Sequence, residues 1–179
     1  RCVDLLVEID DGDVFLGGTI GQGLQAYLLN LRRPLFQDIR VRDALDYSYD
    51  FDTVNRLGLY KRAQSQFNNS EFAALGLPSP GELKLLEPFR AELPAEVFGP
   101  PYRAPSTGRD PKRLRHNLLK ARDLLEQAGW KLAADGKLRN AKGEAFEFEF
   151  LSPSEGGRMA DWQANLEKLG ITLKERNVD

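Results

Sequence analysis

The sequence has few of the residues that build metal and disulfide sites. Among 179 residues there is one cysteine, Cys2, and one histidine, His116. A single cysteine forms no disulfide within the chain, and a single histidine needs cysteine or carboxylate partners to hold zinc. We therefore expect no metal site and no cofactor. Cysteine content alone does not identify the cellular compartment, because a chain without disulfides is compatible with reducing and with oxidising compartments.

Long apolar runs and an excess of one charge are also missing. No segment approaches the roughly 20 uninterrupted apolar residues of a membrane-spanning helix, so we expect no direct membrane insertion. Lys and Arg number 25 against 27 Asp and Glu, which leaves no overall field to attract nucleic acid or anionic lipid. The 41% hydrophobic content is typical of a globular chain.

These properties predict a single domain over residues 1–179, with residues 1–22 as a leading segment that the patterns assign poorly. The chain starts at Arg1 without an initiator methionine or a leader peptide, which indicates a piece excised from a longer protein.

Short apolar runs predict three strands near the start of the chain. Residues 3–9 and 14–19 flank an Asp-rich turn, and residues 24–30 are predicted to form a buried strand. The glycines between 17 and 23 lack the GxxxxGK[ST] pattern and precede a strand, so they indicate a turn and not a phosphate loop.

Capping residues predict the helices that follow. Asp38 is expected to cap a helix over residues 39–45, and Asp50 a second helix over residues 51–59. The sequence Ser79-Pro80-Gly81-Glu82 is a capping box that begins another helix. The apolar face of that helix is predicted to contain Leu83, Leu86 and Phe89.

The second half of the chain predicts an extended segment, a long helix and a strand–helix–strand unit. Prolines keep residues 93–111 extended, and a helix then runs from Asp110 to Gly129. Asp135-Gly136 indicates a hairpin. Apolar and charged side chains alternate over residues 146–150, which predicts a strand with one solvent-exposed face. The predicted fold is α/β (mixed α+β), a mixed sheet with antiparallel hairpins and packed helices. The apolar positions of the last helix are Met159, Trp162, Leu166 and Leu169, and a strand over 171–178 follows.

Two polar features have ordinary structural explanations. His116 lies off the apolar stripe of its helix, and no Ser, Cys or Asp stands at a spacing that predicts a triad, so catalysis is not expected. Basic clusters at residues 32–42 and 109–122 are interrupted by acidic residues and indicate solvated helix faces more than a nucleic-acid surface.

The loop over residues 152–158 is the best binding candidate from local sequence. It joins the end of a predicted strand to the start of a helix, where free backbone N–H groups and Arg158 can hold a carboxylate or another anion. An ordinary capped turn is the alternative.

Several segments resemble one family. Residues 26–45, followed by Tyr49-Asp50, resemble the strand-turn-helix signature of family 5 extracellular solute-binding proteins, the peptide receptors of bacterial ABC importers. Residues 118–130 and 166–171 are similar to later parts of that family in the same order. Residues 62–74 and 93–98 resemble the subgroup linked to microcin C and oligopeptide uptake.

The resemblance implies one lobe of a two-lobed, type II periplasmic-binding-protein-like receptor. Such a receptor captures oligopeptides in the periplasm without covalent chemistry, so it is not an enzyme, and delivers them to an ABC transporter permease. The lobe framework leaves the ligand open, so a nickel complex, a sugar or an antibiotic conjugate is the alternative within the family. A small nucleic-acid-binding protein is the alternative outside it.

The resemblance also implies which residues contact the ligand. The loop before the last helix contributes to the cleft in relatives, which carries over to Ser152, Ser154 and Arg158. The polar loop over residues 62–71 is a second candidate, with Phe67 for apolar contact and Arg62, Asn69 and Glu71 for polar contacts. Structural roles are expected for residues 30–42, where Pro34 fixes a turn and the arginines pair with Asp43 or Asp46.

Overall fold

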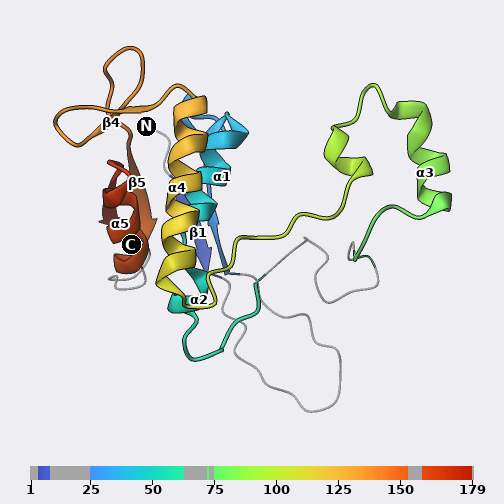
Figure 1. Ribbon diagram of the computed structural model, residues 1–179, viewed down its shortest axis with the longest axis horizontal. Coiled ribbons are helices and arrows are strands. Elements are labelled where there is room, and N and C mark those ends of the chain that lie inside the picture. The colour runs from blue at the N-terminus through green and yellow to red at the C-terminus, as the bar shows by residue number, and fades with distance from the viewer. Residues whose placement is uncertain (1–3, 9–24, 63–71, 73–74, 153–158, 179) are drawn as a thin grey trace. The chain divides into compact units, whose positions relative to one another are not determined.

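The computed structural model describes residues 4–8, 25–62, 72, 75–152 and 159–178 (Figure 1). The chain divides into two compact units. Unit 1 comprises Arg1–Asp50 and Thr107–Asp179, and unit 2 is the segment Phe51–Ser106 that lies between them in the sequence.

Unit 1 contains a four-stranded mixed sheet in the order β2-β1-β5-β6. β1 (Asp4–Glu8) pairs antiparallel with β2 (Gln25–Leu28) and parallel with β5 (Glu147–Ser152). β5 in turn pairs parallel with β6 (Thr172–Asn177). The mixed sheet and the strand over residues 146–150 are therefore confirmed. The predicted strand over residues 14–19 lies outside the described residues.

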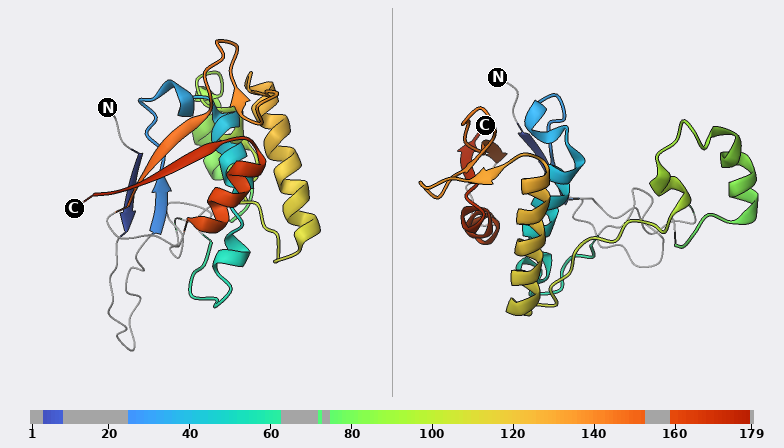
Figure 2. Two further views of the ribbon diagram at one scale, coloured as in Figure 1. Left: turned by 90° about the vertical axis from the view of Figure 1, so that its left-hand side faces the viewer. Right: turned by 45° about the horizontal axis from the view of Figure 1, so that its top comes forward.

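Three helices of unit 1 lie on one side of this sheet (Figure 2). They are α1 (Ile39–Ser48), α4 (Pro111–Gln127) and α5 (Ala160–Lys168), and α4 packs along α1. α5 connects the parallel strands β5 and β6, as a parallel pair requires. A short 3-10 helix, η1 (Pro34–Phe36), precedes α1.

The core of unit 1 lies between the sheet and these helices. In β5, Phe148 and Phe150 are buried whereas Glu147 and Glu149 are exposed, which confirms the predicted alternation. The largest fully buried side chains come from η1, α1, α4, α5 and the segments around the strands: Phe36, Val41, Leu125, Leu138, Phe146, Leu166 and Ile171.

Capping and turn chemistry sets the ends of these elements. The Asp38 carboxylate accepts a 2.9 Å hydrogen bond from the backbone N–H of Arg40, so Asp38 caps α1 as predicted. Gly129, with φ +88°, follows the end of α4. Gly136, with φ +75°, lies in the turn between the antiparallel strands β3 (Lys131–Leu132) and β4 (Leu138–Arg139).

One prediction for unit 1 is wrong: β2 is not a buried strand. Among the strands that the structure describes, β2 is at the edge of the sheet and bonds to β1 alone, and Leu28 is 49% exposed. An apolar run can have the same composition in a central strand and in an edge strand. Whether the strand lies at the centre or at the edge of the sheet depends on its pairing with distant segments.

Unit 2 contains two short α-helices and two 3-10 helices. They are α2 (Phe51–Val54), α3 (Pro80–Leu86), η2 (Glu87–Phe89) and η3 (Ala95–Phe98). The capping box of α3 is confirmed, because Glu82 accepts from the Ser79 N–H at 2.7 Å and Ser79 Oγ accepts from the Glu82 N–H at 3.3 Å. Leu83 and Leu86 are half-buried, but Phe89 is 53% exposed, so the predicted apolar face is only partly covered.

Two predicted boundaries in unit 2 are wrong. α2 stops after four residues, because the Asn55 side chain bonds both backbone groups of Tyr60 and Gly58 turns the chain with φ +68°. The segment expected to be extended contains η3, since no proline occupies residues 95–99 and the Val97 N–H can bond back to the Pro94 carbonyl at 3.1 Å.

Candidate functional site

The candidate site of unit 1 begins where β5 ends. Ser152 is the last residue of β5 and pairs with Asn177 of β6, so the carboxyl ends of two parallel strands meet at this edge of the sheet. Loops at such an edge are where open α/β sheets bind ligands. The Ser152 side chain is on the same face as Phe150 and is 5% exposed. Ser154 and Arg158 lie outside the described residues.

A buried polar network fixes the helix that follows this loop. The Trp162 indole N–H donates to Ser48 Oγ at 2.7 Å, and that hydroxyl donates to the Leu45 carbonyl at 2.6 Å. Asn165 Nδ2 donates to the Ser48 carbonyl at 3.1 Å. All three polar side chains are therefore satisfied in the core. α5 is thereby held against the C-terminal end of α1.

Aromatic rings surround the same part of unit 1. Tyr27 of β2 stacks on Trp162 with ring centroids 5.2 Å apart and planes 16° apart. Its ring also makes edge contacts with Tyr49 and Phe150, at 5.4 and 5.6 Å. Tyr27 and Tyr49 are half-buried, so the group extends from the core to the surface of unit 1, and one of its contacts, Phe150, is two residues before Ser152 in β5. Half-buried aromatic rings of this kind can pack against apolar parts of a ligand.

Sequence patterns did not identify this group as part of a site. Trp162 is predicted as one of four apolar positions of its helix, and Ser48 has no distinguishing motif. The two residues are 114 positions apart, and only the packing of α5 on α1 brings them together.

The chain leaves and re-enters unit 1 at a hydrogen-bonded pair. Thr107 Oγ1 donates to Asp50 Oδ1, and both residues are buried. The same hydroxyl accepts from the Arg109 N–H at 3.1 Å, which holds Arg109 at φ +62°. Asp50, expected to cap the next helix, thus uses one carboxylate oxygen to hold Thr107. Within unit 2, Ser106 Oγ donates to Asp52 Oδ2 at 2.7 Å.

Of the four contact residues predicted in the loop over residues 62–71, the structure describes only Arg62. Arg62 of unit 2 is half-buried and its guanidinium lies 5.2 Å from the centre of the Phe51 ring. Phe67, Asn69 and Glu71 lie outside the described residues. Arg62 and Ser152 belong to different units.

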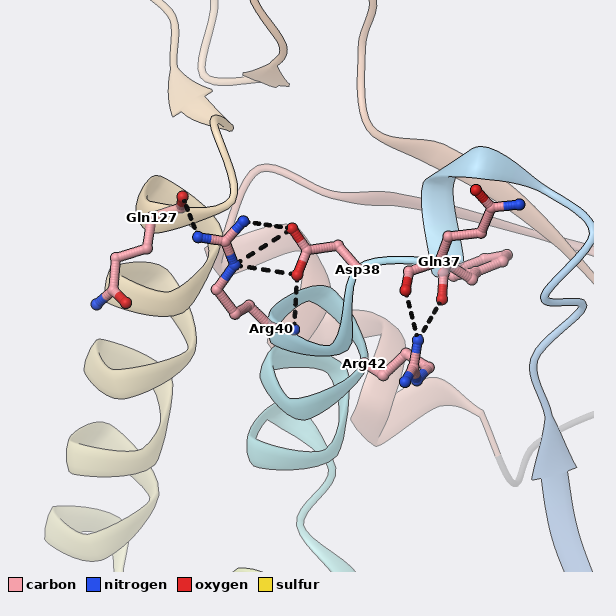
Figure 3. Close-up of polar contacts among 6 residues, drawn as sticks. Gln37, Asp38, Arg40, Arg42 and Gln127 are labelled. Atoms are coloured by element: carbon pink, nitrogen blue, oxygen red, sulfur yellow. Dashed lines mark hydrogen bonds and ion pairs between the residues drawn. The ribbon is translucent and has the colours of Figure 1, made fainter. Parts of the chain in front are cut away.

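The arginines of α1 serve a structural purpose (Figure 3). The Arg40 guanidinium donates to both carboxylate oxygens of Asp38, and its Nη1 donates to the Gln127 carbonyl at the end of α4 at 2.8 Å. Arg42 Nη1 donates to the carbonyls of Phe36 and Gln37 at 2.8 and 2.9 Å. These partners differ from the predicted Asp43 and Asp46, because folding places backbone carbonyls of η1 and α4 within reach.

Two carboxyl groups of this region have shifted pKa values. The hydrogen bond from the Arg40 side chain lowers the pKa of Asp38, because it stabilises the ionised form. Burial raises the pKa of Asp43, since desolvation penalises its charge. Both groups belong to the framework of α1 and not to the candidate site.

Metal and membrane features were searched in the parts of the chain that the structure describes. No group of three or more His, Cys, Asp or Glu residues there is arranged to hold a metal ion. No helix there is long and apolar enough to cross a bilayer. His116 is exposed on α4, as its position off the apolar stripe predicts.

Comparison with known proteins decides the family. Residues 8–179 match the family model described as bacterial extracellular solute-binding proteins, family 5 Middle. The chain belongs to this family. The mixed α/β fold of unit 1 agrees with it, and the resemblance inferred from the sequence is confirmed.

A similar relative is the "Probable peptide-binding protein YejA" of Agrobacterium fabrum. It is 38% identical over 161 residues, which are 87% of this chain and 26% of that protein. The chain therefore spans about a quarter of the length of this relative.

Two solved structures share the fold. The oligopeptide-binding protein AppA of Bacillus subtilis, in complex with a nonapeptide, aligns with a TM-score of 0.55 and 22% identity over 84% of this chain and 25% of its own. NikZ of Campylobacter jejuni, in complex with Ni(L-His), aligns with a TM-score of 0.52 and 22% identity over 83% of this chain and 24% of its own. The same fold thus occurs in proteins solved with quite different bound molecules, a nonapeptide and a nickel–histidine complex.

Proposed function

We propose that this chain is part of a periplasmic receptor that captures oligopeptides and delivers them to the permease of an ABC importer. The observation that carries the proposal is the match of residues 8–179 to family 5 of the extracellular solute-binding proteins. The peptide preference is supported by the name of the A. fabrum relative. In this account residues 1–179 form one lobe, and the rest of a two-lobed receptor supplies the other.

The proposed mechanism is binding without covalent chemistry, so the chain is not an enzyme. A peptide held between two lobes offers backbone N–H and C=O groups along its length and a charged group at each end. Arginine side chains bind a carboxylate through charge-assisted hydrogen bonds, and the closing motion removes the ligand from water.

The proposed contacts of unit 1 come from the loop that follows β5. Ser152, Ser154 and Arg158 contribute to the ligand cleft, with Arg158 as the cation for a carboxylate. The frame of this loop supports the assignment, because the Trp162–Ser48 hydrogen bond fixes the helix that starts directly after it.

The proposed contacts of unit 2 come from residues 62–71. Phe67 provides apolar contact with ligand side chains, and Arg62, Asn69 and Glu71 provide polar contacts.

A nickel complex, a sugar or an antibiotic conjugate is the second candidate ligand class, with the same transport role. The Ni(L-His) ligand of NikZ supports it, because that protein shares this fold.

Isothermal titration calorimetry of the full-length receptor separates the two classes. We expect saturable binding of trialanine or pentaalanine and none of the nickel–histidine complex. Arg158→Ala should weaken peptide binding about tenfold or more, the value of one lost charge-assisted hydrogen bond. Lys142→Ala is the matched control, since Lys142 is an exposed cation in the β4–β5 loop. The Lys142→Ala receptor should bind peptide with the affinity of the wild type. Unchanged affinity in Arg158→Ala contradicts the assigned site.

The isolated 179-residue chain provides a further test. Because it lacks the contacts of the second lobe, it should bind the same peptides far more weakly than the receptor does. Submicromolar affinity of the chain alone contradicts the two-lobed account.

A further inference from the structure

One face of α4 has charges of opposite sign at equal distances from a central leucine. Leu119 is 42% exposed and lies at the centre of this face. Arg115 and Asp123 lie four residues before and after Leu119, and Lys112 and Glu126 lie seven residues before and after it. At about 100° per residue, all four charged positions fall within about 40° of Leu119 around the helix axis. These five residues are called the outer stripe of α4.

The outer stripe points away from the core of unit 1. Asn117 and Ala121 are buried, and each lies about 160° from Leu119 around the helix axis. This buried side of α4 packs along α1. The four charged residues of the outer stripe are exposed. The direction of the outer stripe is therefore set by the packing of helices within unit 1.

The charges of the outer stripe do not stabilise α4 itself. Within the part of the chain that the structure describes, none of the four charged side chains forms a hydrogen bond or an ion pair. The first turn of α4 contains no acidic residue and the last turn no basic residue. Cations near the start of a helix and carboxylates near its end oppose the helix dipole. This charge order weakens the isolated helix, which favours a role in a contact with another molecule.

We propose that the outer stripe of α4 binds the outer stripe of a second copy of this protein, with the two helices antiparallel around a two-fold axis at Leu119. In this arrangement Leu119 faces Leu119 of the second copy. Lys112 faces Glu126 of the second copy, and Arg115 faces its Asp123. Because the axis repeats each contact, four ion pairs surround one apolar contact, as in an isologous interface.

The sign of the charges favours a second copy over other partners. An anionic membrane, or a protein face with carboxylates alone, attracts Lys112 and Arg115 but repels Asp123 and Glu126. A partner that satisfies both halves of the outer stripe must present the same charges in reverse order, and an antiparallel copy does so by symmetry. One helix face buries less than the roughly 800 Å² per partner of a standard interface, so we expect a weak dimer.

Disulfide formation at the two-fold axis tests this pairing in the full-length receptor. Leu119→Cys is placed in a Cys2→Ser background, and copper–phenanthroline with dissolved oxygen oxidises the thiols. A residue on the axis lies beside its own copy, and a disulfide requires a Cα–Cα distance of about 4.4–6.8 Å. Arg113→Cys is the matched control, because Arg113 is exposed on the same helix but lies about 120° from Leu119.

We expect Leu119→Cys to form a disulfide between the two copies at least about tenfold faster than Arg113→Cys, with peptide mapping to identify the linked residues. High salt should slow the reaction of Leu119→Cys, since the Debye length falls to about 3 Å at 1 M ionic strength. Equal rates for the two variants overturn the inference.

Charge exchange then tests which residues face each other. A cationic variant has Asp123→Lys and Glu126→Lys, and an anionic variant has Lys112→Glu and Arg115→Glu, each combined with Leu119→Cys. Either variant alone places like charges opposite each other and should cross-link at least about tenfold more slowly than Leu119→Cys. Both variants suit the helix dipole better than the wild type does, so loss of α4 would not explain a slower reaction.

A one-to-one mixture of the two variants restores opposite charges across the axis. We expect it to form mixed dimers at least as fast as Leu119→Cys forms its own dimer. A mixture that reacts no faster than either variant alone overturns the inference. Binding to vesicles of anionic phospholipid without any cross-link at Leu119→Cys would assign the outer stripe to a membrane and also contradicts it. None of these readouts involves a ligand, so they test this inference separately from the proposed function.

Discussion

The indole nitrogen of Trp162 donates a 2.7 Å hydrogen bond to the hydroxyl of Ser48, a residue 114 positions earlier in the chain. Both side chains are buried. The bond connects α5, which begins after the candidate ligand loop, to the last turn of α1. The orientation of α5 therefore depends on a polar pair in the core and not on apolar packing alone.

Removing one partner of this pair should destabilise the chain. Ser48→Ala leaves the Trp162 N–H buried without its acceptor, at a cost of about 1–3 kcal/mol in the free energy of unfolding. Trp162→Phe removes the donor together with some packing. The double variant should lose less free energy of unfolding than the sum of the losses in the two single variants, because the second substitution removes a group that is already unpaired. Urea unfolding of the four proteins measures the coupling, and strict additivity would contradict the account.

The pair at the boundary of unit 1 gives a second prediction. Thr107→Val removes the hydroxyl that donates to the buried Asp50 carboxylate and accepts from the Arg109 N–H, and it should cost about 1–3 kcal/mol. Thr107→Ser keeps the hydroxyl and should cost much less. Thermal unfolding followed by circular dichroism distinguishes the two variants, and equal losses would show that the hydroxyl contributes nothing.

Gly170 combines an unusual backbone angle with a close contact. Its φ is +79°, and an added Cβ would lie 2.8 Å from the Gly136 carbonyl oxygen and 2.9 Å from the Leu138 nitrogen. Gly143 has the same φ of +79° with open space around it. Gly143→Ala should therefore cost about 1 kcal/mol from backbone strain alone, and Gly170→Ala distinctly more. Denaturant midpoints of the two variants compare these costs, and similar values would contradict the close packing of the β3–β4 turn on Gly170.

Asp38 should make the stability of the chain depend on pH. Its folded-state pKa is lowered by the hydrogen bond from Arg40, so the ionised carboxylate stabilises the fold at pH values above the ordinary pKa of about 4. This contribution is lost as pH falls through the lower folded-state pKa.

The variant Asp38→Asn keeps an oxygen that can cap α1 but does not titrate. Its stability should be lower than that of the wild type at pH 7, and the difference should shrink as pH falls from about 5 to 2. Asp38→Ala also loses the cap and should cost about 1 kcal/mol more than Asp38→Asn. Unfolding curves across this pH range test both statements, and a difference that does not change with pH would rule out the Arg40–Asp38 interaction as its cause.

Local signals in the sequence predicted most elements of unit 1. The Asp38 cap, the Asp110 start of α4, the Asp135-Gly136 turn and the alternation of β5 each depend on neighbouring residues, and each is confirmed. The position of β2 at the sheet edge was missed, because strand order is set by contacts between distant segments.

The candidate site was predictable only as a position in the chain. Loop position and family resemblance indicated Ser152 and its neighbours, but no pattern connects Ser48 to Trp162 or Asp50 to Thr107. Those pairs exist because the packing of helices places polar groups 57 and 114 residues apart next to each other. The short α2 was missed for a different, local reason: the side chain of Asn55 bonds the backbone of Tyr60, and no capping motif in the sequence marks this end of the helix.

Native mass spectrometry of the full-length receptor, purified from its bacterium without denaturation, tests the central claim most directly. The account predicts a series of co-purified masses that fragment as short peptides. A single non-peptide mass, or a bound metal complex, would contradict oligopeptide capture as its function. The protein's membership of family 5 would still hold.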